Sequence, residues 1–201
     1  IQNWLARYGA LKAEVHEFQV AAIAELKDRD FRHIADAATT RSYDLSAEAD
    51  EPVELAAGFR IIDMAECPDY GAKARLNLDV DLGETQVSEF DLLRFAYSRE
   101  SPAYDASVDL SVVASDGSHV ASCVGFDDPT HSVAEIEKVI THHQYRRQGL
   151  AEAVIRECFH RLHRRGIERA YITGYSDAAN RLYERLGPCH HKQWYHYELR
   201  P

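Results

Sequence analysis

The sequence has no apolar stretch near the ~18 residues that a transmembrane helix needs, and no charged-then-apolar signal segment at its start. Cysteine is scarce: the 201 residues contain four, and no two of them form a CxxC pair. These absences argue against a membrane span, a secretion signal and a disulfide framework. They favour a cytoplasmic protein with reduced, mostly buried thiols at Cys67, Cys123, Cys158 and Cys189.

Positive charge is also in short supply. Lys and Arg total 23 against 33 Asp and Glu, which gives a formal net charge of −10. This balance disfavours binding to nucleic acid or anionic lipid and mildly favours a cationic substrate. The adjacent Arg146 and Arg147 are a local exception, so any anion that they attract is expected to be small.

Metal-ligand spacing is missing among the eleven histidines. No Cys, Asp or Glu partner stands at ligand spacing beside the three groups of histidines, which are His142 with His143, His160 with His163, and His190 and His191 with His196. His160 is also expected on the polar side of its helix. The sequence therefore predicts no metal site.

From residue 59 onward, period-two alternation predicts strands and apolar spacing of three to four residues predicts helices. The expected strands are 59–65, 107–114, 119–126, 133–141, 168–174 and 192–199, and the expected helices are 70–80, 87–98, 150–165 and 177–187. Asp116-Gly117 is typical of a hairpin turn between two of these strands. This order of elements indicates an α/β fold, with a mixed sheet flanked by helices.

The helix at 150–165 has the clearest pattern. Leu150, Val154, Cys158 and Leu162 recur at every fourth position, which predicts one apolar stripe. Basic residues fill its last turn and Gly166 follows, as the helix dipole and a left-handed stop both favour.

The loop before this helix, "QYRRQGLA", places two arginines and one glycine at a helix start. Unpaired N–H groups at such a start favour an anion, and a side chain at Gly149 would keep phosphates from the backbone. The sequence has no GK[ST] motif and no GxGxxG motif here, which argues against the common nucleotide loops. From spacing alone, a solvated loop remains an equal interpretation.

The run "RRQGLA" resembles the R/Q-x-x-G-x-G/A signature of the GNAT superfamily of N-acetyltransferases, and "ANRLYERLG" resembles a later part of the same family. The element order from Phe59 to Leu199 is similar throughout. The resemblance implies a GNAT-like acyl-CoA N-acyltransferase fold for residues 59–201.

The resemblance also implies acetyl-CoA as the acyl donor. Its pyrophosphate would lie on Arg146, Arg147, Gln148, Gly149, Leu150 and Ala151, and its pantetheine arm on Val139, Ile140 and Thr141. Further contacts would come from Ser176, Asn180 and Tyr183. Ser176 stands where the family often has Asn, and Asn180 is the nearby substitute. Pro188 stands where the family has Phe, which leaves the entry into the last strand open.

Acyl transfer to an amine needs a base, because an amine with a pKa of ~10.4 is almost fully protonated at neutral pH. Glu135 and Glu137 lie two residues apart on one predicted strand and therefore share a face. Glu135 matches the position at which the family places a general base, and Glu137 is the second candidate. Tyr183 matches the family's proton donor to the CoA sulfur. The alternatives are a solvated sheet face for the glutamates and core packing for the tyrosine.

Residues 1–58 resemble the tail of another GNAT unit. A helix is expected at 18–29, strands at 31–37 and 40–45, and an acidic linker at 46–58. Because the first residue is Ile1, we expect the C-terminal part of a tandem GNAT protein, which would self-associate or pack against a missing N-terminal unit. The alternative is a natural accessory segment.

Together these observations predict an acetyl-CoA-dependent N-acetyltransferase. A non-catalytic CoA-binding domain is the alternative of another class, and a longer acyl group or a hydroxyl acceptor would use the same donor motif. The acceptor depends on the segment between Ala65 and Asp105, so its identity stays open.

Overall fold

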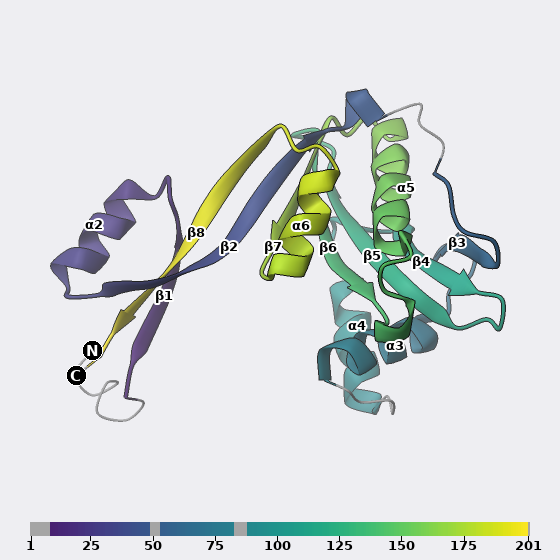
Figure 1. Cartoon of the computed structure of the whole chain (residues 1–201), viewed down its shortest axis with the longest axis horizontal. Helices are drawn as coiled ribbons and strands as arrows, with labels where there is room; N and C mark the ends of the chain where they lie inside the picture. The colour runs from purple at the N-terminus through teal and green to yellow at the C-terminus, as the bar shows by residue number, and fades with distance from the viewer. Residues whose placement is uncertain (1–8, 49–52, 83–87, 201) are drawn as a thin grey trace. The chain divides into compact units, whose positions relative to one another are not determined.

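The computed structural model describes residues 9–48, 53–82 and 88–200. The chain forms two compact units: unit 1 consists of Ile1–Ser42 and Thr173–Pro201, and unit 2 is Tyr43–Ile172. The predicted α/β class is confirmed, because helices flank one mixed sheet with the strand order β1-β8-β2-β7-β6-β5-β4-β3 (Figure 1).

Four strands of unit 2 form an antiparallel meander, in which each strand pairs with the next along the chain. They are β3 (Phe59–Asp63), β4 (Tyr104–Ala114), β5 (His119–Asp128) and β6 (Val133–Thr141). The predicted hairpin turn is present: Gly117 has a φ of +88°, and Asp116 Oδ1 accepts a hydrogen bond of 2.9 Å from the Ser118 N–H. The strands therefore form where the alternating pattern predicted them.

The helix α5 (Leu150–Arg164) connects β6 to β7 (Arg169–Gly174), which is parallel to β6. Its predicted apolar stripe is buried, and Gly166 ends it with a φ of +84°. The prediction that His160 lies on the polar side was wrong, because His160 is only 7% exposed. When a helix packs against a sheet, the face that becomes buried is wider than the stripe of apolar residues in its sequence.

Arg161 of α5 and Arg165, the residue that follows its last turn, tie the helix to the ends of neighbouring strands. Arg161 Nη1 donates to Asp63 Oδ2 at 2.5 Å, and Arg165 pairs with Asp105 at 2.6 Å and with Asp127 at 3.0 Å. These contacts give Arg165 a structural role within unit 2.

The opposite face of the sheet carries α3 (Tyr70–Leu82), and α4 (Glu89–Ser98) follows it in the chain. Lys73 of α3 is buried, forms an ion pair with Asp109 and donates to the carbonyl oxygens of Leu110 and Cys123. Asp109 of β4 lies directly opposite Val124 of β5, and Val124 in turn lies directly opposite Glu137 of β6. Since directly opposed residues share a face, Lys73 anchors α3 to the face that carries Glu137.

In unit 1, β8 (His190–Leu199) lies between β1 (Leu11–His16) and β2 (Arg32–Asp44) and is antiparallel to both (Figure 1). The N-terminal helix is present as α2 (Val20–Asp28), and α6 (Asp177–Arg185) precedes β8. Both neighbours of the last strand therefore come from the first 44 residues.

The prediction of two separate strands at 31–37 and 40–45 was wrong, because β2 is one strand of 13 residues. Its pairing with β8 shifts register between His33 and Ala35 and again between Asp36 and Ala38. These irregularities are β-bulges within one strand and do not end it, because β8 pairs with β2 on both sides of each bulge.

Part of the predicted linker 46–58 lies outside the described residues. Before it, Leu45–Glu48 forms a short 3-10 helix, and the Leu45 N–H donates to the Glu168 carbonyl at 3.0 Å. Residues 53–56 form no helix or strand.

All four thiols are free, with Cys123 and Cys158 buried and Cys67 and Cys189 exposed. The expectation of mostly buried thiols thus holds for two of the four. None of the described helices combines the length and the apolar character needed to cross a membrane.

Candidate functional site

The loop between β6 and α5 has an unusual backbone. After a short 3-10 turn at His143–Tyr145, Arg147 has a φ of +62° and Gly149 a φ of +78°. The left-handed region is unfavourable for a residue with a side chain, so Arg147 is held there by the surrounding loop. The two left-handed residues bend the chain sharply into the first turn of α5.

The backbone N–H groups at this bend make no hydrogen bond to any residue that the structure describes. Among the described residues, none accepts a hydrogen bond from the backbone N–H groups of residues 147–151. A Cβ built on Gly149 would meet no atom within 4 Å, so the space in front of it is open. Several donors without partners at a helix start, beside open space, fit an anion such as a diphosphate.

The two predicted arginines of this loop are exposed. Arg146 Nε donates to the Thr141 carbonyl at 3.2 Å, which links the loop to the end of β6. Its terminal nitrogens make no hydrogen bond within the described part of the chain, and they remain as donors beside the helix start. Gln148 is exposed as well, whereas Leu150 is buried under the loop.

The strand β6 is irregular where it approaches the loop. Lys138 has a φ of +51°, and the register with β5 shifts between the pairs Val124 with Glu137 and Ser122 with Ile140. This is a β-bulge, which bends a strand and interrupts its pairing. The pairing of β6 with β7 covers only Val133 to Glu135, so the described backbone of Val139–Thr141 has no partner on β7.

Glu135 and Glu137 lie on one face of β6, as predicted, opposite Phe126 and Val124 of β5. Partial loss of hydration raises the pKa of the Glu135 carboxyl, and the charge and hydrogen bonding of Glu137 raise it further. The Glu135 side chain is still reachable from solvent. A reachable carboxylate with a raised pKa is suited to accept a proton.

The remaining predicted residues lie on α6 in unit 1. Ser176 Oγ accepts from the Ala179 N–H at 3.2 Å and thereby caps the helix. Asn180 follows one turn later, and Tyr183, which is 5% exposed, comes three residues after Asn180. The structure thus gathers the predicted residues into two groups, one around β6 and α5 in unit 2 and one on α6 in unit 1.

Comparison with known families gives a decisive match. The sequence model of the Acetyltransferase (GNAT) family matches residues 78–187, which is more than half of the chain and contains both groups. The chain belongs to the GNAT family of acetyltransferases. No curated protein matches it significantly.

Solved structures share the GNAT fold at low sequence identity. A GCN5-related N-acetyltransferase from Sphaerobacter thermophilus has a TM-score of 0.70 and 20% identity, and the match covers 96% of this chain and 60% of that one. One from Kribbella flavida has a TM-score of 0.64 and 22% identity, with coverages of 98% and 71%. A tandem GNAT protein from the clavulanic acid biosynthesis pathway has a TM-score of 0.73 and 14% identity, with coverages of 95% and 64%. The chain thus spans about two thirds of the length of these relatives.

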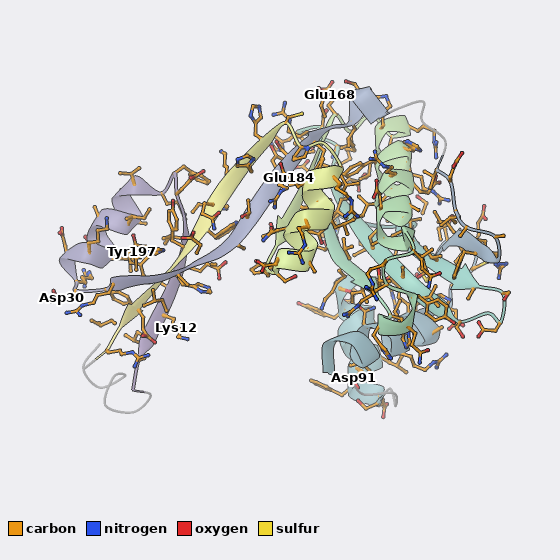
Figure 2. The ribbon with its side chains drawn as sticks, viewed as in Figure 1. Lys12, Asp30, Asp91, Glu168, Glu184 and Tyr197 are labelled. Atoms are coloured by element: carbon orange, nitrogen blue, oxygen red, sulfur yellow. The ribbon has the colours of Figure 1, made fainter. Side chains whose placement is uncertain are left out.

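Sequence reasoning missed one buried residue beside the second group of this GNAT chain. Arg41 of β2 contacts α6 through Asn180 and Glu184 (Figure 2 labels Glu184). The contact joins residues 139 and 143 positions apart, so no local pattern marks it. The only signal was an arginine in a segment that otherwise reads as a strand.

Proposed function

We propose that this GNAT protein transfers the acetyl group of acetyl-CoA directly to the nitrogen of an amine acceptor. The observation that carries the proposal is the start of α5. There the backbone N–H groups of residues 147–151 have no acceptor among the described residues, and a Cβ built on Gly149 would meet no atom within 4 Å. Acetyl-CoA, when bound, supplies an activated thioester and a diphosphate that such a helix start would hold.

The loop would bind the diphosphate through backbone and side chain together. The dipole of α5 contributes roughly 0.3–2 kcal/mol, so directed N–H bonds and the Arg146 and Arg147 guanidinium groups must supply the rest. Gln148, Leu150 and Ala151 contribute through their backbone. Arg146 is the stronger side-chain candidate, because its bond to Thr141 already fixes its direction.

The unpaired edge of β6 would bind the pantetheine arm. The amide groups of the arm have the same donors and acceptors as a strand, so they can pair with the backbone of Val139, Ile140 and Thr141. The bulge at Lys138 supports this role, because it accompanies the end of pairing between β6 and β7.

Glu135 is the proposed general base. It would take a proton from the ammonium form of the acceptor, directly or through water, and its raised pKa makes it a stronger base than an ordinary carboxylate. Glu137 would support it, because a second negative charge on the same face raises the pKa of Glu135 and attracts a cationic amine.

The residues of α6 have the complementary role. Tyr183 would donate a proton to the departing sulfur, and Asn180 would bind the donor. Ser176 is engaged as the helix cap, so we assign its backbone rather than its hydroxyl to any contact with the donor.

The proposal is tested by titrating the full chain with acetyl-CoA in a calorimeter and then measuring thiol release over a panel of amines. We expect saturable binding and release with at least one amine. Release with hydroxyl acceptors alone, or only with longer acyl groups, would correct the acceptor or donor class. Binding without release on any acceptor would instead indicate a CoA-binding domain without catalysis, and no binding at all would refute the proposal.

A further inference from the structure

Arg41 is a buried cation on β2, in the part of the chain that the sequence assigned to the tail of another GNAT unit or, alternatively, to an accessory segment. Its side chain is 9% exposed. Nε donates to Glu184 Oε2 at 3.0 Å, and Nη1 donates to Asn180 Oδ1 at 2.8 Å. Removing a guanidinium from water is costly, so these two acceptors determine where it lies.

The two acceptors occupy one side of α6. Asn180 and Glu184 are four residues apart, so their side chains lie one above the other, and Tyr183 lies between them in sequence. By holding both acceptors, Arg41 fixes the rotation of the helix turn that carries Tyr183.

Gly174 at the end of β7 provides the space for this arrangement. A Cβ built there would lie 2.4 Å from Asn180 Oδ1 and 3.2 Å from Tyr183 Cδ2. Any side chain at this position would displace the Asn180 amide and press on the Tyr183 ring. Gly174 and Arg41 therefore confine the Asn180 side chain from two directions.

The chemistry of the contact fixes the direction of the amide. A guanidinium has only donors, so the amide atom that faces Arg41 must be the oxygen. The Nδ2 group, with its two N–H donors, then points away from Arg41. An asparagine held in this way presents donors and no acceptor to a ligand.

We propose that Arg41 is a positioning residue for the acyl donor: it holds Asn180 Oδ1 so that the Asn180 N–H groups donate to oxygen atoms of CoA. The inference rests on the proposed function, and it adds a contribution from the N-terminal segment to donor binding. Because Arg41 acts through Asn180, removing either side chain has the same consequence for CoA.

The test is a double-mutant cycle on CoA affinity, measured by calorimetry with free CoA on the full chain. Arg41→Lys keeps the positive charge but replaces the planar guanidinium, whose separate N–H groups reach two acceptors, by a single ammonium group. We expect Arg41→Lys and Asn180→Ala each to weaken CoA binding by about 10-fold, the range of a charge-assisted hydrogen bond. The double variant is expected to bind no more weakly than Asn180→Ala alone.

Arg32→Lys is the matched control, because it makes the same exchange on an exposed side chain of the same strand. It should leave CoA affinity within about twofold of the wild type. Gly174→Ala perturbs Asn180 while Arg41 is intact, and it keeps the inference testable if Arg41→Lys does not fold. It should weaken CoA binding in the wild-type background. In the Asn180→Ala background it should have a smaller effect, because the 2.4 Å clash with the amide is gone and only the 3.2 Å contact with Tyr183 remains.

The outcomes separate the two proposals. If the wild type binds CoA and Arg41→Lys lowers only the unfolding temperature, Arg41 is merely structural and the inference is overturned while the proposed function stands. Additive losses in the double variant would likewise overturn action through Asn180. If the wild type binds no CoA, the proposed function fails and this inference fails with it.

Discussion

Glu135 differs from an ordinary surface glutamate because a second carboxylate, Glu137, lies on the same face of β6. Partial desolvation and the neighbouring charge raise the pKa of Glu135. On the acid side, kcat/KM should therefore begin to fall at a higher pH than it would with a base of ordinary carboxyl pKa. Replacing Glu137 by Gln removes the charge and should move the onset of this fall to lower pH. The measurement is kcat/KM against pH for wild type and Glu137→Gln.

Glu135→Gln tests the base itself. We expect turnover to fall by ~10²–10⁴, the usual contribution of a general base, with CoA affinity nearly unchanged. Turnover and calorimetric affinity are measured on the same preparation, which separates catalysis from binding. Wild-type turnover across the pH range would remove Glu135 from the mechanism.

The start of α5 gives a third prediction for single residues. Arg146→Ala should weaken acetyl-CoA binding by about 10-fold, because a charge-assisted hydrogen bond to the diphosphate is lost. Gly149→Ala should weaken binding as well and lower the free energy of unfolding by about 1–2 kcal/mol, because alanine at a φ of +78° is strained. Calorimetry and urea unfolding measure the two effects. Unchanged affinity in both variants would place the donor elsewhere.

At the scale of elements, the ion pairs in the last turn and at the C-terminal cap of α5 predict how stability depends on pH. Partial burial opposes ionisation of Asp63, but hydrogen bonds from Arg161 and from backbone N–H groups outweigh it and lower the pKa of this carboxyl. A hydrogen bond from Ser107 lowers the pKa of Asp105, and Arg165 contributes, although partial burial opposes the shift. A carboxyl with a depressed pKa stabilises the fold above its unfolded value of ~3.9 and loses this contribution as the pH falls through its folded value.

The free energy of unfolding should therefore decrease as the pH drops below about 4. Arg161→Met should be less stable than the wild type at neutral pH, and its stability should fall less steeply with acid. Urea unfolding at a series of pH values from 6 to about 2.5 compares the two slopes. Identical slopes would show that the Asp63 pair contributes nothing to the acid sensitivity.

At the scale of the whole molecule, the N-terminal segment supplies both strands that flank β8. A chain that starts at residue 59 would lose β1, β2 and Arg41. We expect β8 and α6 to lose their protection in such a fragment, because β8 would have no hydrogen-bonding partner on either side. Unit 2 should keep its meander. Hydrogen exchange measured by residue compares the fragment with the full chain.

This experiment also tests the predicted boundary at residue 58, which stays a prediction. Full protection of 173–199 in the fragment would support an independent domain from 59 to 201. Loss of protection confined to those residues would show that β8 and α6 of this chain depend on residues 1–58.

The local parts of the structure were predictable from the sequence. The strand 133–141, the helix from Leu150 and the loop with Arg146 and Gly149 follow from alternation, apolar spacing and a glycine at a helix start, all of which act over a few residues. The shared face of Glu135 and Glu137 follows from the geometry of a strand in the same way. The bulge at Lys138 was not predictable in detail, because it depends on pairing with β5.

What the sequence by itself determined is therefore the family, most of the order of elements and the arginine- and glycine-bearing loop at the start of α5, because short-range spacing encodes each of them. Only the tertiary structure decided that β2 is one continuous strand, that His160 is buried, and that Arg41 holds Asn180 and Glu184. Each of these three features depends on which strand or helix, distant in the sequence, packs against the segment concerned. The free energy of that packing comes from contacts between residues far apart in the chain, and no local pattern records them.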